Sequence, residues 1–326
     1  MKNTINHLDE NQIITVIKQK VESGNLDNIS RTDAYFTYFL NHSDILWSFL
    51  ASMVSRNAGW NMCELEGKWF PQALEPETRK QLFLTYERAN WLIFQDAYPQ
   101  LLLYDYSTKL NTPMFHLLRY FQVSSFMINE WANYWREKDK RRLMTALIIN
   151  EQNIIQKPVI EHPIYYKKVF HSLLFAFQDY LHFSAVLFPT HHGELYGASV
   201  YGFQDVDNRI DLGRRLADIL FNPDVFSKVF HFAKTTAHTG SRYDYEQFMK
   251  NKEETTPFLK ETYPVIKHHI HLPNEWTKHP SVKNKWFRTE IIHRHPWEMT
   301  HWYSNKQKQI RFFIMCYNLL QMKNRI

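Results

Sequence analysis

Residues 76–99 read PETRKQLFLTYERANWLIFQDAYP, and this stretch decides the predicted fold class. Its apolar side chains recur every three or four residues, at Leu82, Tyr86, Ala89, Ile93 and Ala97. This spacing places them on one face of an α-helix. Pro76 suits the first position of a helix, whereas a proline in a helix interior removes a backbone hydrogen bond. The sequence therefore predicts a long helix from Pro76 that breaks at Pro99, with a new helix over 101–110.

Glycine is scarce along the whole chain. There are 8 glycines in 326 residues, whereas average usage of about 7% would give roughly 23. Sheet proteins use glycine in hairpins and bulges, and helix interiors exclude it. Aromatic residues make up 16% of the chain, and so much ring surface favours a folded core. We predict an all-α fold, a single compact domain of roughly ten to fourteen helices.

The predicted domain covers residues 30–326, and residues 1–29 are predicted to be an N-terminal lead-in. Ser30 carries a side chain that can cap the first helix of the domain. A second helix restarts at Ser43-Asp44 and is predicted to stop at Gly59, because glycine commonly terminates helices.

The stretch 188–207 interrupts the helical rhythm. It follows a long helix predicted over 164–187, and it holds Gly193, Gly197 and Gly202. We predict an irregular glycine-containing loop here, which is also the best candidate for a sub-boundary of the domain. Asp207 or Asn208 is predicted to cap the helix that follows.

The expected compartment is the cytoplasm. The two cysteines, Cys63 and Cys316, match no disulfide framework or metal spacing. The N-terminus lacks the features of a signal peptide, and no transmembrane segment is predicted. The net charge of +6 is concentrated in the basic C-terminal part, 250–326. An anionic partner is therefore expected there.

Two segments offer candidate ligand-binding residues. In the first, Arg56 could hold a carboxylate or phosphate while Trp60 stacks on a ring, with Asn57 between them. A structural interpretation is simpler, since Arg56 complements a helix end and Trp60 belongs to the core. The second segment is the glycine-rich stretch, followed by the irregular Thr239-Gly240-Ser241-Arg242. Its candidates are His191, His192, Asp205, Asp207 and Arg242. Convergence of Arg56, Asp205 and Arg242 on one cavity would favour a small-molecule site, and their dispersal would favour structural roles for all three.

A metal site is a weaker alternative. Asp179 and His182 are three residues apart, as are Glu290 and His293. Paired E-x-x-H motifs with two further glutamates hold di-iron centres in helical bundles. Here one member is aspartate and the two further glutamates cannot be assigned. No metal is favoured and no cofactor is predicted.

A nucleic-acid surface is the third possibility. Between residues 267 and 311, nine Lys and Arg alternate with aromatic residues, against three acids. Basic residues can follow a phosphate backbone while rings stack on bases. Lys283, Lys285 and Arg288 are the candidates. A solvated basic surface over an aromatic core explains the same pattern.

Three segments are distinctive enough to compare with known families. They are Ser30-Arg31-Thr32-x-Ala34-Tyr35, Met53-Val54-Ser55-Arg56-Asn57-Ala58-Gly59-Trp60-Asn61-Met62, and the stretch from Leu195-Tyr196-Gly197 to Asp211-Leu212-Gly213. These segments resemble the YppC-like family of endospore-forming Gram-positive bacteria. The resemblance implies a bacterial cytoplasmic protein. The family is a domain of unknown function, so the resemblance implies no reaction and no catalytic residue.

The leading functional hypothesis is a non-enzymatic binding or interaction protein. Its partner would be a protein or a small molecule near the glycine-rich stretch and the Arg56–Trp60 segment. A di-iron-like enzyme and a nucleic-acid-binding protein are the alternatives.

Overall fold

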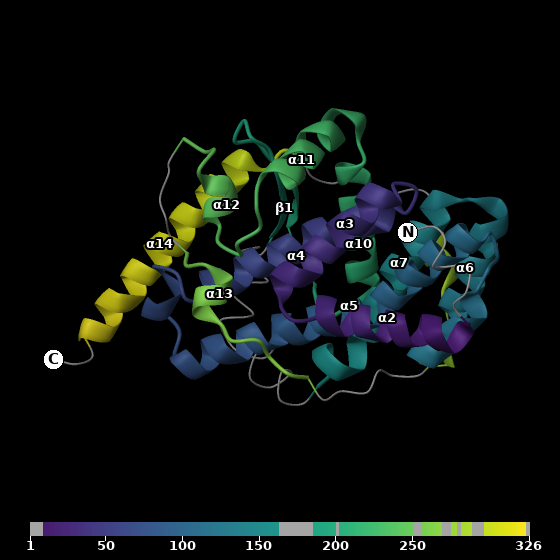
Figure 1. The fold of residues 1–326 in the computed structure, drawn as a ribbon. Helices are drawn as coiled ribbons and strands as arrows, with labels where there is room; N and C mark the ends of the chain where they lie inside the picture. Colours follow the sequence, from purple (N-terminus) through teal and green to yellow (C-terminus); the bar gives the residue numbers. More distant parts are fainter. Residues whose placement is uncertain are drawn as a thin grey trace.

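A computed structural model describes residues 9–162, 185–199, 202–250, 256–268, 275–278, 282–288 and 297–323. Within these ranges the regular elements are helices and one small hairpin (Figure 1). The predicted all-α fold is confirmed. No helix in the described ranges is long and apolar enough to cross a membrane.

The longest helix of the core is α5, Pro76–Leu110. It begins at Pro76 as predicted, but it continues through Pro99 without a break, so the predicted break is wrong. Pro99, Leu101, Leu102 and Leu103 are all buried. Packing on both sides of the proline therefore offsets the one backbone hydrogen bond that it removes.

The helical core starts before Ser30. Helix α2, Glu10–Gly24, buries Ile13, Ile14, Ile17 and Val21 and packs along α5. Helix α3, Asn28–Asn41, follows it directly. Its N-cap is Asp27, whose carboxylate accepts a 2.7 Å hydrogen bond from the Ser30 amide. The predicted cap at Ser30 is therefore wrong by three residues.

Helix α4, Leu46–Glu64, lies at the centre of the fold (Figure 1). It is buried on nearly all sides, which is typical of a helix surrounded by others. The predicted start at Ser43-Asp44 is wrong, because Asp44 instead accepts hydrogen bonds from the hydroxyls of Tyr104 and Tyr134. The predicted end at Gly59 is also wrong, since the helix runs five residues beyond it.

Further helices complete this side of the core. A 3₁₀ helix, Phe115–Phe121, leads into α6, Ser125–Glu137, and α7, Lys140–Ile154. A short π-helical turn, Gln156–Ile160, follows α7. The side chains of α2 to α7 share one hydrophobic cluster with α10, Val206–Leu220, and α11, Pro223–Thr235.

The stretch predicted as an irregular loop contains a β-hairpin. Strand β1, Ala185–Pro189, pairs antiparallel with β2, Leu195–Ser199. The last residues of the helix predicted over 164–187 are thus a strand, and residues 163–184 lie outside the described ranges. Gly197 sits opposite Leu187, where an added Cβ would lie 3.0 Å from the Val186 carbonyl carbon. The glycines of this stretch therefore serve a close backbone approach.

The C-terminal part contains short elements and one long helix. The short ones are α12, Tyr243–Glu246, and α13, Leu259–Thr262, with 3₁₀ turns at Trp276–Lys278 and Asn284–Phe287. The long helix is α14, Thr300–Lys323. It passes α12 and extends toward the C-terminus (yellow in Figure 1).

Candidate functional site

The Arg56–Trp60 segment lies inside α4, where its polar side chains fix neighbouring elements. The Asn57 amide donates 2.8 Å to the Leu187 carbonyl and accepts 2.7 Å from the Leu187 amide. It therefore pairs with the edge of β1 as another strand would. Arg56 donates to the carbonyls of Ala233 and Thr236 at the end of α11, at 3.2 and 2.8 Å.

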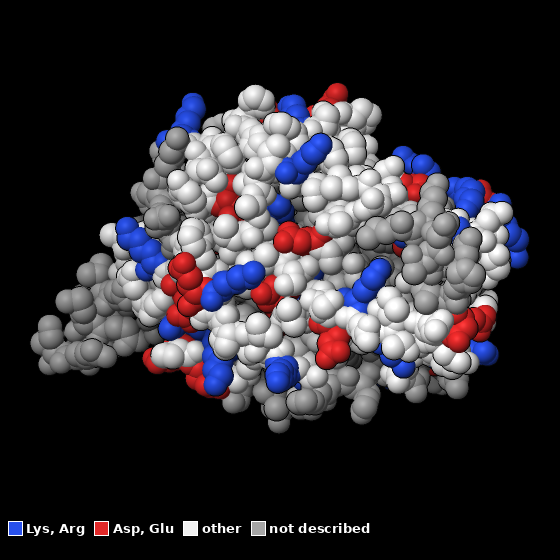
Figure 2. All heavy atoms as spheres, viewed as in Figure 1, with Lys and Arg blue, Asp and Glu red and all other residues white. Residues whose placement is uncertain are grey.

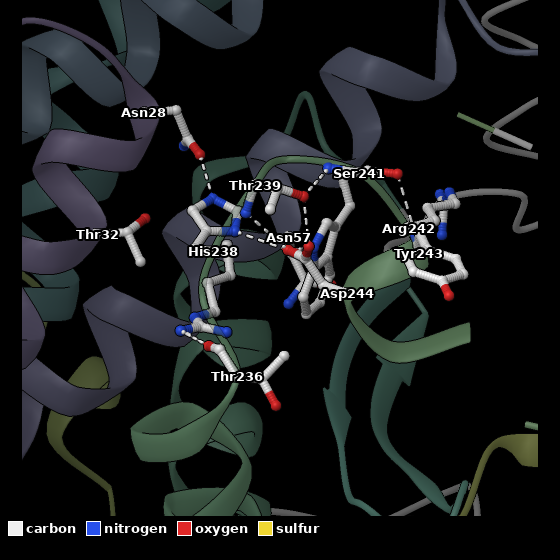
Figure 3. A network of polar contacts seen from close by, with 12 residues as sticks. Asn28, Thr32, Asn57, Thr236, His238, Thr239, Ser241, Arg242, Tyr243 and Asp244 are labelled. Atoms are coloured by element: carbon white, nitrogen blue, oxygen red, sulfur yellow. Dashed lines mark hydrogen bonds and ion pairs between the residues drawn. The ribbon is translucent and has the colours of Figure 1, made fainter. Parts of the chain in front are cut away.

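A buried hub of hydrogen bonds forms around Asp244 (Figure 3). Its carboxylate accepts from the Trp60 indole at 2.9 Å and from the Thr239 amide at 3.1 Å. His238 Nδ1 lies 3.2 Å from the same carboxylate, and the Thr239 hydroxyl donates to its other oxygen. The hub thus fastens the loop 236–244 to α4.

The second nitrogen of His238 reaches α3. His238 Nε2 lies 2.7 Å from Asn28 Oδ1, and the Asn28 amide donates 2.8 Å to the Ser55 carbonyl. The side chain of His238 is 0% exposed, and each ring nitrogen lies within hydrogen-bonding distance of a protein oxygen. Gly59 makes this possible, because an added Cβ there would lie 2.8 Å from His238 Nε2. Close packing explains this glycine where a helix terminus had been predicted.

Burial and charge set the protonation of the hub. Burial lowers the pKa of His238 below its usual value, and Arg56 adds to this, although Asp244 opposes it. Burial acts to raise the pKa of Asp244, but hydrogen bonds from His238, Thr239 and Trp60 lower it overall. Burial also lowers the pKa of Arg56 to about 10. Asp244 is therefore ionised and Arg56 still protonated at neutral pH.

Arg242 starts a second chain of hydrogen bonds that leads away from the hub. Its guanidinium pairs with Glu64 and donates 2.5 Å to the Tyr245 hydroxyl. Tyr245 donates 3.0 Å to the Tyr303 hydroxyl, which donates 2.7 Å to Glu246. Burial raises the pKa of both tyrosines, so both phenols keep their protons. The chain ties α4 to α12 and α14.

This second chain ends at the wall of a cavity of about 390 Å³. The cavity is lined by residues 192–194 of the hairpin turn, by Glu246 and residues 248–250, and by one face of α14 from Thr300 to Arg311. Tyr303 and Glu246 belong to both the chain and the lining. The cavity is thus formed where three separate segments meet.

The structure brings together only some of the predicted ligand residues. His192 lines the cavity. Arg242 lies behind the cavity wall, where its guanidinium donates hydrogen bonds to the hydroxyls of Tyr245 and Tyr303. His191 instead hydrogen-bonds the Thr236 hydroxyl at 2.9 Å. Arg56, Asn57 and Trp60 are buried behind the hairpin and the hub.

Asp205 and Asp207 lie apart from this cavity, at the start of α10. Asp205, and neither Asp207 nor Asn208, is the N-cap of α10, and it accepts from the Asp207 amide at 2.7 Å. Arg56, Asp205 and Arg242 therefore do not converge on one cavity.

The predicted nucleic-acid candidates are partly neutralised by Asp207. Its carboxylate pairs with Lys283 at 3.1 Å and with Lys285 at 2.5 Å, and it accepts 2.7 Å from the Trp286 indole. Arg288 is exposed at the end of the same turn. On the face shown in Figure 2, basic and acidic side chains are interspersed.

The predicted metal candidates cannot be placed. Asp179, His182, Glu290 and His293 all lie outside the described residues. Among the residues that are described, no group of three or more His, Cys, Asp or Glu could hold a metal ion.

Sequence reasoning missed His238, Asp244, Glu246 and Tyr303. Three of them follow Thr236 closely, and the segment His238-Thr239-Gly240-Ser241-Arg242-Tyr243-Asp244 concentrates polar residues around a glycine. This density was the available signal. Asn28, the partner of His238, and Trp60, the partner of Asp244, lie 210 and 184 residues away in the chain, and no sequence period connects such distant residues.

Comparison with known proteins places the chain in a family. It is 45% identical over 300 residues to the uncharacterised protein YppC of Bacillus subtilis (strain 168), covering 92% of this chain and 93% of the relative. No solved structure matches. Residues 23–304 match the family described as proteins of unknown function, DUF2515. The predicted resemblance is confirmed, and the chain belongs to the DUF2515 family.

Proposed function

We propose that this protein binds a small molecule, without transforming it, in the cavity between α14, the hairpin turn and residues 246–250. The observation that carries the proposal is the cavity itself. Its volume of about 390 Å³ falls within the range of about 300–1,000 Å³ that is usual for ligand sites. Its lining combines apolar Phe248 and Met249 with a larger set of polar side chains, many of them on α14, and polar groups in a site fix the orientation of a ligand.

The wall of the cavity is held in place before any ligand arrives. Tyr303 is fixed by hydrogen bonds to Tyr245 and Glu246, and Arg242 holds Tyr245 from behind. Thr300 accepts a 3.0 Å hydrogen bond from the Leu195 amide, which fixes the start of α14 against the hairpin. A wall that is already ordered loses little conformational entropy on binding, and this favours affinity.

Binding is favoured over catalysis by the position of the one His–Asp pair in the hub. A general base must come within hydrogen-bonding reach of its substrate. His238 is fully buried, with Asn28 on one side and Asp244 on the other. The pair therefore supports a scaffold that positions the cavity wall, since Asp244 and Glu246 belong to the same short helix.

The test is retention of small molecules from a bacterial metabolite extract. Protein is incubated with the extract and freed of unbound solutes by gel filtration, and retained molecules are identified by mass spectrometry. A Ser304→Trp variant fills the cavity, whereas Asn305→Trp adds the same ring to an exposed position outside the lining of the same helix. We expect wild type and Asn305→Trp to retain the same molecule and Ser304→Trp to lose it. Equal retention by all three proteins, or none by wild type, would overturn the proposal.

A further inference from the structure

We infer that the ligand of this cavity is a small organic anion whose acidic group lies against Lys308. The inference rests on the proposed function and adds the chemical class of the ligand. It follows from the charges of the lining, from the way the acids of the lining are already satisfied, and from the arrangement of polar side chains along α14.

The charged side chains of the lining are positive on balance. Three of them are Lys or Arg, namely Lys250, Lys308 and Arg311, and two are acids. Lys250 and Lys308 form no hydrogen bond or ion pair with any other described residue, and both are exposed at the cavity. Of the two acids, Glu194 is paired with Lys228 at 3.1 Å, and Glu246 acts on the charge of Arg242. This balance favours an anion.

One face of α14 presents hydrogen-bonding groups in a line. Thr300, Ser304 and Lys308 are four residues apart, so they lie one above the other on the helix. Arg311 follows Lys308 by three residues, and its guanidinium lies over the Trp69 ring, 5.4 Å from the centroid. From Thr300 to Arg311 the helix rises about 16 Å. The positive charge lies at the end of this line that is far from the hairpin.

The remainder of the lining selects a molecule with an apolar part. Phe248 and Met249 precede Lys250 directly and line the cavity with it. An anion without apolar surface would leave these side chains in contact with water, whereas an organic ring or chain would cover them. A carboxylate and a phosphate both satisfy a lysine ammonium, so an organic carboxylate or phosphate is the inferred class.

The experiment compares three probes of similar shape by isothermal titration calorimetry: phenyl phosphate, benzoate and benzyl alcohol. The variants are Lys308→Gln and Lys306→Gln. Lys306 carries the same charge on the same helix but lies over the Trp302 ring, outside the lining. Lys308 is exposed, so its replacement leaves the fold intact.

We expect both anions to bind more tightly than benzyl alcohol. Lys308→Gln is expected to raise the dissociation constants of both anions about tenfold or more, the usual effect of losing a hydrogen bond to a charged group. Lys306→Gln should leave these constants unchanged. The tighter anion identifies the acidic group. Binding of benzyl alcohol as tightly as the anions, or anion binding unaffected by Lys308→Gln, would overturn the inference. Retention of a neutral metabolite that Ser304→Trp abolishes would overturn it while leaving the proposed function standing.

Discussion

The carboxylate of Glu246 accepts a 2.7 Å hydrogen bond from the hydroxyl of Tyr303, and this bond joins α12 to α14 at the wall of the cavity. Two residues before Glu246, Asp244 holds His238 and Trp60 in the buried hub. The hub and the cavity wall are thus opposite sides of one short helical turn. A change that loosens the hub is therefore expected to disturb the cavity.

Replacing Asp244 by Asn tests the hub directly. The substitution keeps the shape of the side chain but removes the negative charge of the carboxylate that hydrogen-bonds Trp60, His238 and Thr239. We expect a loss of about 2–4 kcal/mol in the free energy of unfolding, because buried donors lose a charged acceptor. Urea unfolding measures this loss. Asp205→Asn is the control, since Asn is an equally good N-cap; an equal, small effect of both variants would show that the hub contributes little.

The second prediction concerns acid stability. Burial lowers the pKa of His238, so in acid the unfolded chain binds a proton at this residue more readily than the folded chain does. Stability must then fall as the pH drops below the unfolded value of about 6.5. Asp244, Arg56 and Asp33 are the charged groups that act on this ring. We expect wild type to lose more stability between pH 7 and 5 than His238→Gln, as followed by urea unfolding at each pH. Parallel pH profiles would contradict this assignment.

Asp96 is predicted to change stability with pH in the direction opposite to His238. Burial raises its pKa to about 7, although hydrogen bonds from Asn150 and Gln100 act to lower it. The folded chain then holds a proton that the unfolded chain releases, so this residue costs stability as the pH rises toward 7. We expect the free energy of unfolding of Asp96→Asn, relative to that of wild type, to rise by about 3 kcal/mol between pH 5 and 8. A difference between the two proteins that does not change with pH would argue against a buried, protonated Asp96.

The close packing at Gly59 is tested by a double-mutant cycle. In Gly59→Ala the new Cβ meets Asn28 Oδ1 and the His238 ring, so at least one of the two must move. We expect Gly59→Ala in the otherwise wild-type protein to lower the free energy of unfolding by about 2–4 kcal/mol. In an Asn28→Ala background the cost should be smaller, since space has been made. Additive effects of the two changes would mean that Gly59 is not required for the close contact with Asn28 and His238.

The basic turn near Asp207 is expected to contribute little to stability. Lys283 and Lys285 share the Asp207 carboxylate and are each nearly half exposed, so a double Lys→Gln change should leave the urea unfolding midpoint almost unchanged. Wild-type binding to DNA or RNA should be weak. A tight, steeply salt-dependent binding that disappears in the double variant would instead support a nucleic-acid surface.

The sequence predicted the helices better than their ends. The apolar period located α5, because helical periodicity is a local property. Pro99 and Gly59 were interpreted by their usual local roles, and both predictions failed for the same reason. Each residue lies in the packed interior, where contacts from distant segments outweigh the local preference.

The candidate site was predicted only in part. The glycine-rich stretch drew attention to His192 and Gly193, which line the cavity, but the predicted irregular loop is in part a hairpin. Arg242 was identified, whereas Tyr303 was not. Tyr303 lies 61 residues further along the chain, and only the fold brings the two side chains together.

The measurement that tests the central claim most directly is a crystal structure of the protein with the metabolite it retains. We predict the molecule between Phe248 and the Ser304–Lys308 face of α14, with Tyr303 at its side and its acidic group toward Lys308. A molecule bound elsewhere on the protein, with this cavity unoccupied, would contradict the account.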